Sequence, residues 1–84
     1  MEHAKRRRSA VHTDEYQYLL KRLRQARRLA GLTQVEVARA LRRPQSFVTK
    51  CELGERRIDP IDLKHFAKLY RKPVSFFLPP RSSR

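Results

Sequence analysis

At 84 residues the chain is long enough for one domain with a small core, but too short to enclose a sizeable active site. Its 21 Lys and Arg residues outnumber its 8 Asp and Glu residues, which gives a formal net charge of +13. Such an excess favours polyanionic partners, nucleic acid above all. With so few acidic residues and no pairing of a nucleophile with a base, we expect a binding protein rather than an enzyme.

Cys51 is the single cysteine, so an intramolecular disulfide is excluded, and we expect this side chain to be a small part of the core. No apolar stretch is long enough to span a membrane, and no signal-peptide pattern follows the basic start of the chain. His3 and His12 have no partners at the spacing of metal ligands. We therefore expect a cytoplasmic, nucleoid-associated protein that needs no metal and no cofactor.

Residues 1–12 show no hydrophobic period and carry a basic run from Lys5 to Arg8. We predict that this segment is flexible, as short terminal segments of such composition are. Two interpretations stay open. The segment is either a solvated tail, or an arm that becomes ordered on DNA phosphates or in the minor groove.

The first predicted helix begins at Thr13 and Asp14, where a capping residue is followed by acidic residues that favour a helix start. Gly31 is the predicted end of this helix. Between them, apolar residues recur every three or four positions and should form one buried stripe. These residues are Tyr16, Leu19, Leu20, Leu23, Ala26 and Ala30.

Residues 33–53 predict two short helices joined by a tight turn. Thr33 and Glu36 form a capping box, and Pro44 ends the first helical run while suiting the first turn of the next. In the second helix, residues 44–53, the inward positions are Phe47, Val48 and Cys51. The outward face is polar and uncharged to basic, which is typical of a helix that enters the DNA major groove.

The rest of the chain predicts two further helices. Gly54 ends the preceding helix, and Asp59 followed by Pro60 begins another with an apolar face that includes Ile61. Residues 73–78 read as a last short helix capped by Ser75, and residues 79–84 as a tail. We therefore predict an all-α domain of five helices over residues 13–78. Its expected core is Leu19, Leu23, Leu32, Val37, Leu41, Val48, Ile58, Leu63, Phe66 and Leu69.

Three stretches, GLTQVEVARAL, PQSFVTKCELGERR and DPIDLKHFAKLY, resemble the Cro/CI-type (XRE-like) helix-turn-helix repressors, and the resemblance spans roughly residues 19–78. It implies a five-helix, lambda-repressor-like domain that binds a double-stranded DNA operator and regulates transcription as a repressor. One position departs from the pattern. Arg42 stands where the turn usually has glycine, so it must adopt a left-handed conformation, or the turn must be reshaped.

Glutamine, lysine, serine and threonine can all hydrogen-bond to base edges. The predicted base contacts are Gln45, Ser46, Thr49 and Lys50. The resemblance implies base contact at three of these positions, with Thr49 close by. It also implies that Gln34 binds phosphate and braces Gln45, and that Arg27 forms an ion pair with Glu52. The other predicted phosphate contacts are Arg24, Arg28, Arg43, Arg56 and Arg57.

Phe76 and Phe77 cannot both be buried easily in so short a terminal helix, so we expect one in the core and the other at a partner surface. The resemblance implies that this surface joins two copies into a homodimer. One alternative is an antitoxin-like module whose main task is to bind a partner protein through the same patch. Another is a nonspecific nucleic-acid-binding protein that relies on charge alone.

Overall fold

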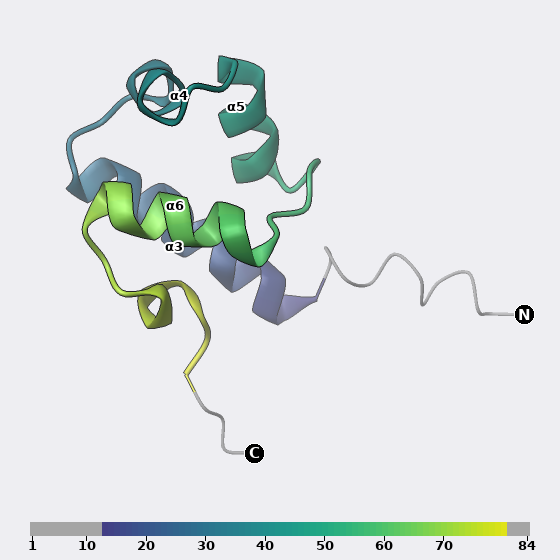
Figure 1. The fold of residues 1–84 in the computed structure, drawn as a ribbon. Helices are drawn as coiled ribbons and strands as arrows, with labels where there is room; N and C mark the ends of the chain where they lie inside the picture. The colour runs from purple at the N-terminus through teal and green to yellow at the C-terminus, as the bar shows by residue number, and fades with distance from the viewer. Residues whose placement is uncertain (1–12, 81–84) are drawn as a thin grey trace, which may run out of the picture.

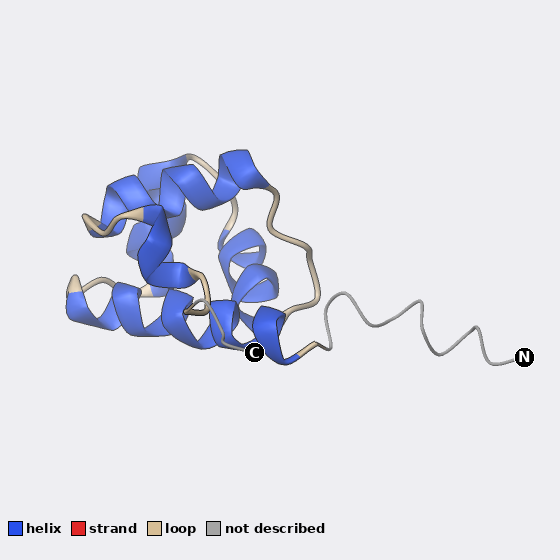
Figure 2. Ribbon diagram, turned by 90° about the horizontal axis from the view of Figure 1, so that it is seen from below, coloured by secondary structure: helices blue, strands red, loops and turns tan. Residues whose placement is uncertain are grey.

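The computed structural model describes residues 13–80, which form only helices and the loops between them (Figure 2). The elements are α3 (Asp14–Leu29), α4 (Gln34–Leu41), α5 (Gln45–Leu53), α6 (Pro60–Tyr70) and the 3-10 helix η1 (Val74–Phe77). The all-α class is confirmed, but the expected fifth helix is a short 3-10 helix rather than an α-helix. The expected arm, residues 1–12, and the last part of the expected tail, residues 81–84, lie outside the described residues. None of the described helices is long and apolar enough to cross a membrane.

Side-chain caps fix the start of three helices. The hydroxyl of Thr13 accepts the Tyr16 amide at 3.1 Å, and an Asp59 carboxylate oxygen accepts the Asp62 amide at 2.8 Å. The capping box at α4 is complete, with the Thr33 amide donating to Glu36 Oε1 at 2.8 Å and the Glu36 amide donating to Thr33 Oγ1 at 3.1 Å. These bonds satisfy amide groups that have no partner inside their own helix.

The turn between α4 and α5 is not reshaped to avoid a left-handed residue. Arg42 takes that conformation itself, with φ of 59° and ψ of 44°, and its amide donates to the carbonyl groups of Ala38 and Arg39. Arg71 ends α6 with the same φ and ψ. A non-glycine side chain in this region costs roughly 1–2 kcal/mol relative to glycine, so both helix ends carry a local strain that the sequence pattern revealed only at Arg42.

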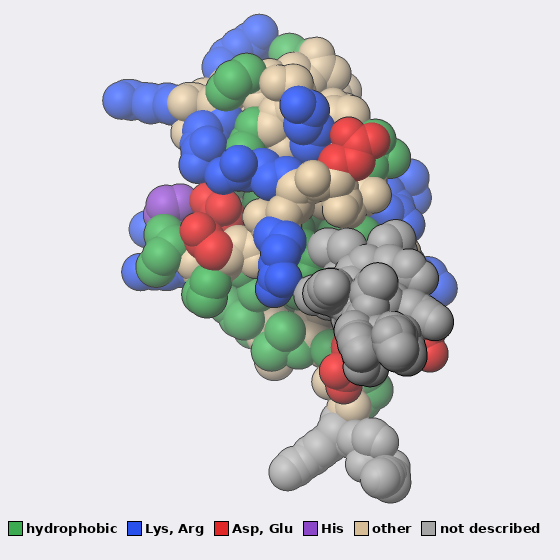
Figure 3. Space-filling model, turned by 90° about the vertical axis from the view of Figure 1, so that its right-hand side faces the viewer, with side chains coloured by type: hydrophobic (Ala, Val, Ile, Leu, Met, Phe, Trp, Pro, Cys, Tyr) green, Lys and Arg blue, Asp and Glu red, His purple; other side chains and the backbone are tan. Residues whose placement is uncertain are grey.

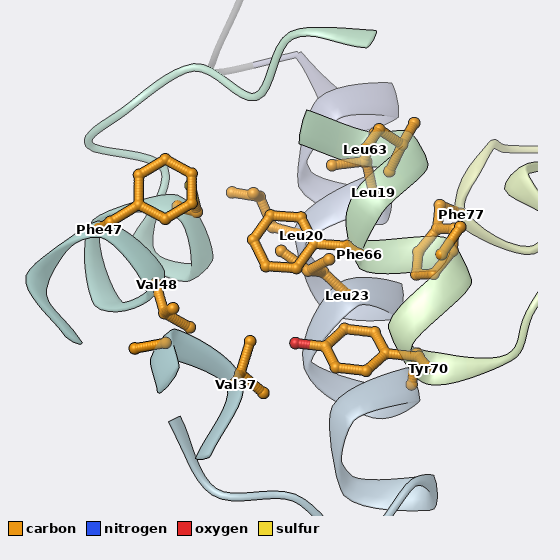
Figure 4. Packing of buried hydrophobic residues seen from close by; sticks show 14 residues of the cluster. Leu19, Leu20, Leu23, Val37, Phe47, Val48, Leu63, Phe66, Tyr70 and Phe77 are labelled. Atoms are coloured by element: carbon orange, nitrogen blue, oxygen red, sulfur yellow. The ribbon is translucent and has the colours of Figure 1, made fainter. Parts of the chain in front are cut away.

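The core lies between α3 and α6 on one side and the α4–α5 pair on the other, while η1 covers the far side of α3 and α6 (Figure 1). Figure 4 shows Phe47 and Val48 of α5 opposite the ring of Phe66, with Phe77 entering from the other side. Phe47 stacks on Phe66 with ring centroids 6.1 Å apart, and Phe66 stacks on Tyr70 at 5.9 Å. This aromatic column joins the inner face of α5 to α6.

Several predictions about the core were wrong in detail. Ala30 lies beyond the last turn of α3 and is exposed, and Ile61 is 59% exposed. In α6 the inward positions belong to Asp62, Leu63 and Phe66, so Ile61 falls outside the buried arc. Four members of the expected core are only half-buried and pack against its edge: Leu32, Leu41, Ile58 and Leu69.

The C-terminal segment also differs from the prediction. The residue before η1 is Pro73, which has no side-chain group to cap it, so Ser75 is not the cap. Phe77 is fully buried, so it is the ring of the pair that joins the core, as expected of one of them, and it is not available as a partner surface. Phe76 is half-buried because the guanidinium of Arg22 lies 3.6 Å from its ring centroid, while Arg22 Nε donates to the Phe76 carbonyl at 2.8 Å.

Candidate nucleic-acid interface

α5 divides cleanly into an inner and an outer face. Phe47, Val48 and Cys51 are buried, whereas Gln45, Ser46 and Lys50 are exposed. The side chains on the outer face are two amide or hydroxyl groups and one ammonium group, all able to hydrogen-bond to base edges. The helix therefore presents polar groups along one side while its other side holds it on the core.

Thr49, the fourth predicted base contact, is half-buried and has a partner inside the protein. Its hydroxyl donates to Gln34 Oε1 at 2.7 Å, and Gln34 Nε2 donates to Glu52 Oε1 at 2.9 Å. Both ends of the Gln34 amide are therefore used within the fold, toward Thr49 and Glu52 rather than toward Gln45. The side chain of Gln34, the first residue of α4, thus lies against α5 at Thr49 and Glu52.

The structure brings Arg27 and Glu52 together. Arg27 Nε lies 2.7 Å from Glu52 Oε2, Arg27 Nη2 donates to Glu52 Oε1 at 3.2 Å, and Arg27 Nη1 donates to the Leu32 carbonyl at 3.1 Å. The hydrogen bond from Arg27 to Glu52 raises the pKa of the guanidinium, against the opposing effect of burial. Arg24 also contributes, since its Nη1 donates to the Glu52 backbone carbonyl at 3.0 Å. Two arginines of α3 thus hold the C-terminal end of α5.

The other arginines predicted to bind phosphate stay accessible, and two of them lie against the Phe47 ring of α5. The Arg43 guanidinium lies 4.0 Å from the centroid of the Phe47 ring, and the Arg56 guanidinium lies 4.9 Å from it. Arg43 also meets Asp62 at 3.5 Å, although 40% of its side chain remains exposed. Arg28 and Arg57 are exposed as well. Figure 3 shows Lys and Arg side chains gathered over the upper part of the side that carries α5 and the following loop.

A glycine turn and a hydrogen bond to a tyrosine side chain hold the loop after α5. Gly54 ends the helix at φ of 82°, a conformation that glycine adopts at little cost. The Ile58 amide donates to the Tyr16 hydroxyl at 3.0 Å, which ties the loop to the first turn of α3. Arg56 and Arg57 therefore project from an anchored segment next to the outer face of α5.

Two buried side chains beneath this surface are kept neutral. Burial raises the pKa of the Cys51 thiol to about 11, with a smaller contribution from the charge of Asp62. Burial also raises the pKa of Tyr70 well above its usual range, and the charge of Glu52 adds to this effect. Within residues 13–80, the Tyr70 hydroxyl has no hydrogen-bond partner. A buried, protonated thiol such as that of Cys51 is unreactive.

Sequence reasoning missed two residues that shape this surface, Tyr16 as the anchor of the loop and Asp62 as the partner of Arg43, and it missed Arg22, which holds η1 on the far side of the core. Their partners lie up to 54 positions away in the chain, as with Arg22 and Phe76. Helical periodicity reports which side of a helix is inward, but it does not report which distant residue is met there.

Comparison with known protein families adds one finding. The family described as helix-turn-helix domain matches residues 19–74, which is more than half of the chain. The match begins in α3 and ends at the first residue of η1, so it includes α4, α5 and the loop that follows them. No curated protein matches the sequence.

Proposed function

This chain belongs to the helix-turn-helix domain family, a premise from which we propose that it is a sequence-specific regulator of transcription. It binds a double-stranded DNA operator and acts as a repressor by occupying it. Within that family we assign it to the Cro/CI-type (XRE-like) group. The observation that carries this proposal is the outer face of α5, where Gln45, Ser46 and Lys50 are exposed on a helix whose inner face is locked into the core.

α5 lies in the major groove in this proposal, where each base pair presents a distinct pattern of donors and acceptors. Gln45 suits adenine, to which glutamine makes a bidentate contact, and Lys50 suits the acceptors of guanine. Ser46 can donate or accept. Contacts of this kind carry sequence information, whereas contacts to phosphate position the protein without choosing the sequence.

Phosphate contacts come from the four arginines of the predicted set that are exposed, Arg28, Arg43, Arg56 and Arg57. Arg24 and Gln34 were also predicted to bind phosphate. One nitrogen of the half-buried Arg24 donates to the Glu52 carbonyl and its other donors stay available, whereas both ends of the Gln34 amide are used inside the fold, so we count only the four arginines as contacts. Four phosphate contacts give a slope of log affinity against log salt of about −3.6. Removing one of these arginines should reduce the slope by about 1.

Selection of bound duplexes from a random pool tests this function. The wild-type chain should enrich a defined sequence, and Gln45→Ala and Lys50→Ala should each relax the preference at particular base positions, at a cost of about 1–3 kcal/mol. Arg56→Ala is the matched control, because it should weaken all duplexes alike. A wild-type chain that enriches no sequence at physiological salt would instead favour the nonspecific, charge-driven alternative.

We further propose that two copies bind each operator. The proposed surface is the half-buried Phe76 together with Val74 and Leu78, which are 41% and 44% exposed. A two-fold dimer predicts half-sites about 34 Å apart, and sedimentation with a selected duplex should give two copies per duplex. A single copy at saturation would contradict the dimer. The same surface would serve the antitoxin-like alternative, which co-purification of a second, different chain would favour.

A further inference from the structure

Four side chains form a directed chain of hydrogen bonds from the core to the outer face of α5. Arg27 Nε donates to Glu52 Oε2 at 2.7 Å, and Gln34 Nε2 donates to Glu52 Oε1 at 2.9 Å. Gln34 Oε1 then accepts the Thr49 hydroxyl at 2.7 Å. Glu52 is only 2% exposed, whereas Thr49 lies half-buried at the edge of the polar face. The buried end is therefore fixed, and the outer end is next to the proposed DNA surface.

The direction of this chain follows from the chemistry at its buried end. A carboxylate paired with a guanidinium can only accept hydrogen bonds, so Gln34 must turn its NH₂ group toward Glu52. Its carbonyl oxygen then faces Thr49, and that oxygen can also only accept. The hydroxyl proton of Thr49 is thereby committed to Gln34. If the Gln34 amide were flipped, its carbonyl oxygen would face the Glu52 carboxylate, and two acceptors would lie against each other.

Resting on the function proposed above, we propose that Thr49 is a specificity-determining residue that offers DNA an acceptor and a methyl group, but no donor. A hydroxyl normally reads any base, because it can donate or accept. With its proton committed, Thr49 suits the amino group of adenine or cytosine, and its methyl suits the thymine methyl. Guanine presents only acceptors in the major groove, so guanine is disfavoured at the base that Thr49 faces.

Lys50, the next residue in the chain, offers DNA donors where Thr49 offers an acceptor. Lys50 carries only donors and is exposed, so it favours the acceptors of guanine. Adjacent residues on one helix therefore impose opposite preferences, one against guanine and one for it. Gln34 acts as a positioning residue in this scheme, because it sets the polarity of Thr49 without touching a base.

The test is selection from a random duplex pool with the wild-type chain and three variants. Thr49→Ala identifies the base position that Thr49 reads, and Lys50→Ala serves as the matched control. At the Thr49 position, the wild-type chain should disfavour guanine by roughly two- to tenfold, which is the net contribution of one hydrogen bond. Gln34→Met should restore guanine at that position alone, because the hydroxyl proton is then free to rotate. The proposal is overturned if guanine stays disfavoured in Gln34→Met, or if the wild-type chain prefers guanine there.

A second measurement tests the hydrogen-bond chain without DNA. The hydroxyl proton of Thr49 should exchange slowly enough to be observed by NMR in the wild-type chain, with a nuclear Overhauser contact to Gln34, and should be lost in Gln34→Met. A rapidly exchanging Thr49 hydroxyl in the folded wild-type chain would refute the inference even if the protein selects a sequence. Conversely, a wild-type chain that selects no sequence refutes the proposed function, whatever the hydroxyl signal shows.

Discussion

Replacing Glu52 with glutamine should be the most damaging isosteric change in the domain. The substitution keeps the shape of the side chain, so it creates no cavity, but it removes the charge that faces the Arg27 guanidinium. Glu52 is 2% exposed and its carboxylate receives three hydrogen bonds, from Arg27 Nε, Arg27 Nη2 and Gln34 Nε2. Breaking a buried ion pair by removing one partner costs about 3–5 kcal/mol. Because 14% of the Arg27 side chain still reaches solvent, we expect a loss near the lower end, about 3 kcal/mol.

Urea unfolding followed by circular dichroism measures this loss. With a slope of about 1 kcal/mol per molar urea, typical of a small domain, the midpoint should fall by about 3 M. Arg43→Gln is the matched control, because its ion pair with Asp62 is longer, at 3.5 Å, and more exposed. That variant should cost less than about 1 kcal/mol. If Glu52→Gln costs no more than Arg43→Gln, the ion pair does not fasten α5 to α3 and the reasoning fails.

Three further predictions concern positions beneath or beside the interface. Gly31 and Gly54 both have positive φ, but an added Cβ meets nothing within 4 Å at Gly31 and lies 2.9 Å from a Leu20 methyl at Gly54. Thermal unfolding should therefore show Gly54→Ala to be the more destabilising variant; equal losses would mean that backbone strain alone matters. The Cys51 pKa is raised from 9.0 to about 11, so the stabilisation from its protonated thiol is complete below pH 9 and is lost as the pH rises through 11. At pH 8 alkylation by iodoacetamide should require unfolding, and rapid labelling of the native protein would contradict its burial. Tyr70→Phe removes a buried hydroxyl that lacks a partner in the described residues, so by urea unfolding it should be neutral or stabilising, and a loss above about 1 kcal/mol would reveal an unseen partner.

The elements that local chemistry determines could be predicted from the sequence. Thr33 with Glu36 forms the capping box, Asp59 caps a helix that begins at Pro60, and Gly54 ends α5. Each of these signals acts within a few residues, so it needs no knowledge of the rest of the fold. The start of α5 was predicted one residue early, because Pro44 is the residue before the helix rather than its first residue.

What could not be predicted depends on how distant elements meet. The apolar residues of α6 cover a wider arc than the core can bury, so the sequence did not reveal that Ile61 stays exposed while Asp62 turns inward. The partners of Gln34 are a second example. The resemblance implied contact with Gln45, but the chain has a hydroxyl at Thr49, closer to the inner side of α5, which donates to Gln34 Oε1 instead. The Phe76–Phe77 pair is a third, because only the packing of η1 decides which ring is buried.

The central claim is that α5 lies in the major groove, and nuclear Overhauser contacts in a complex with a selected duplex test it most directly. We predict contacts from the side-chain protons of Gln45, Ser46 and Lys50 to thymine methyl and cytosine H5 protons, which line that groove. If these side chains show no contact to DNA, or contact only minor-groove protons while another face of the domain meets the duplex, the account is contradicted.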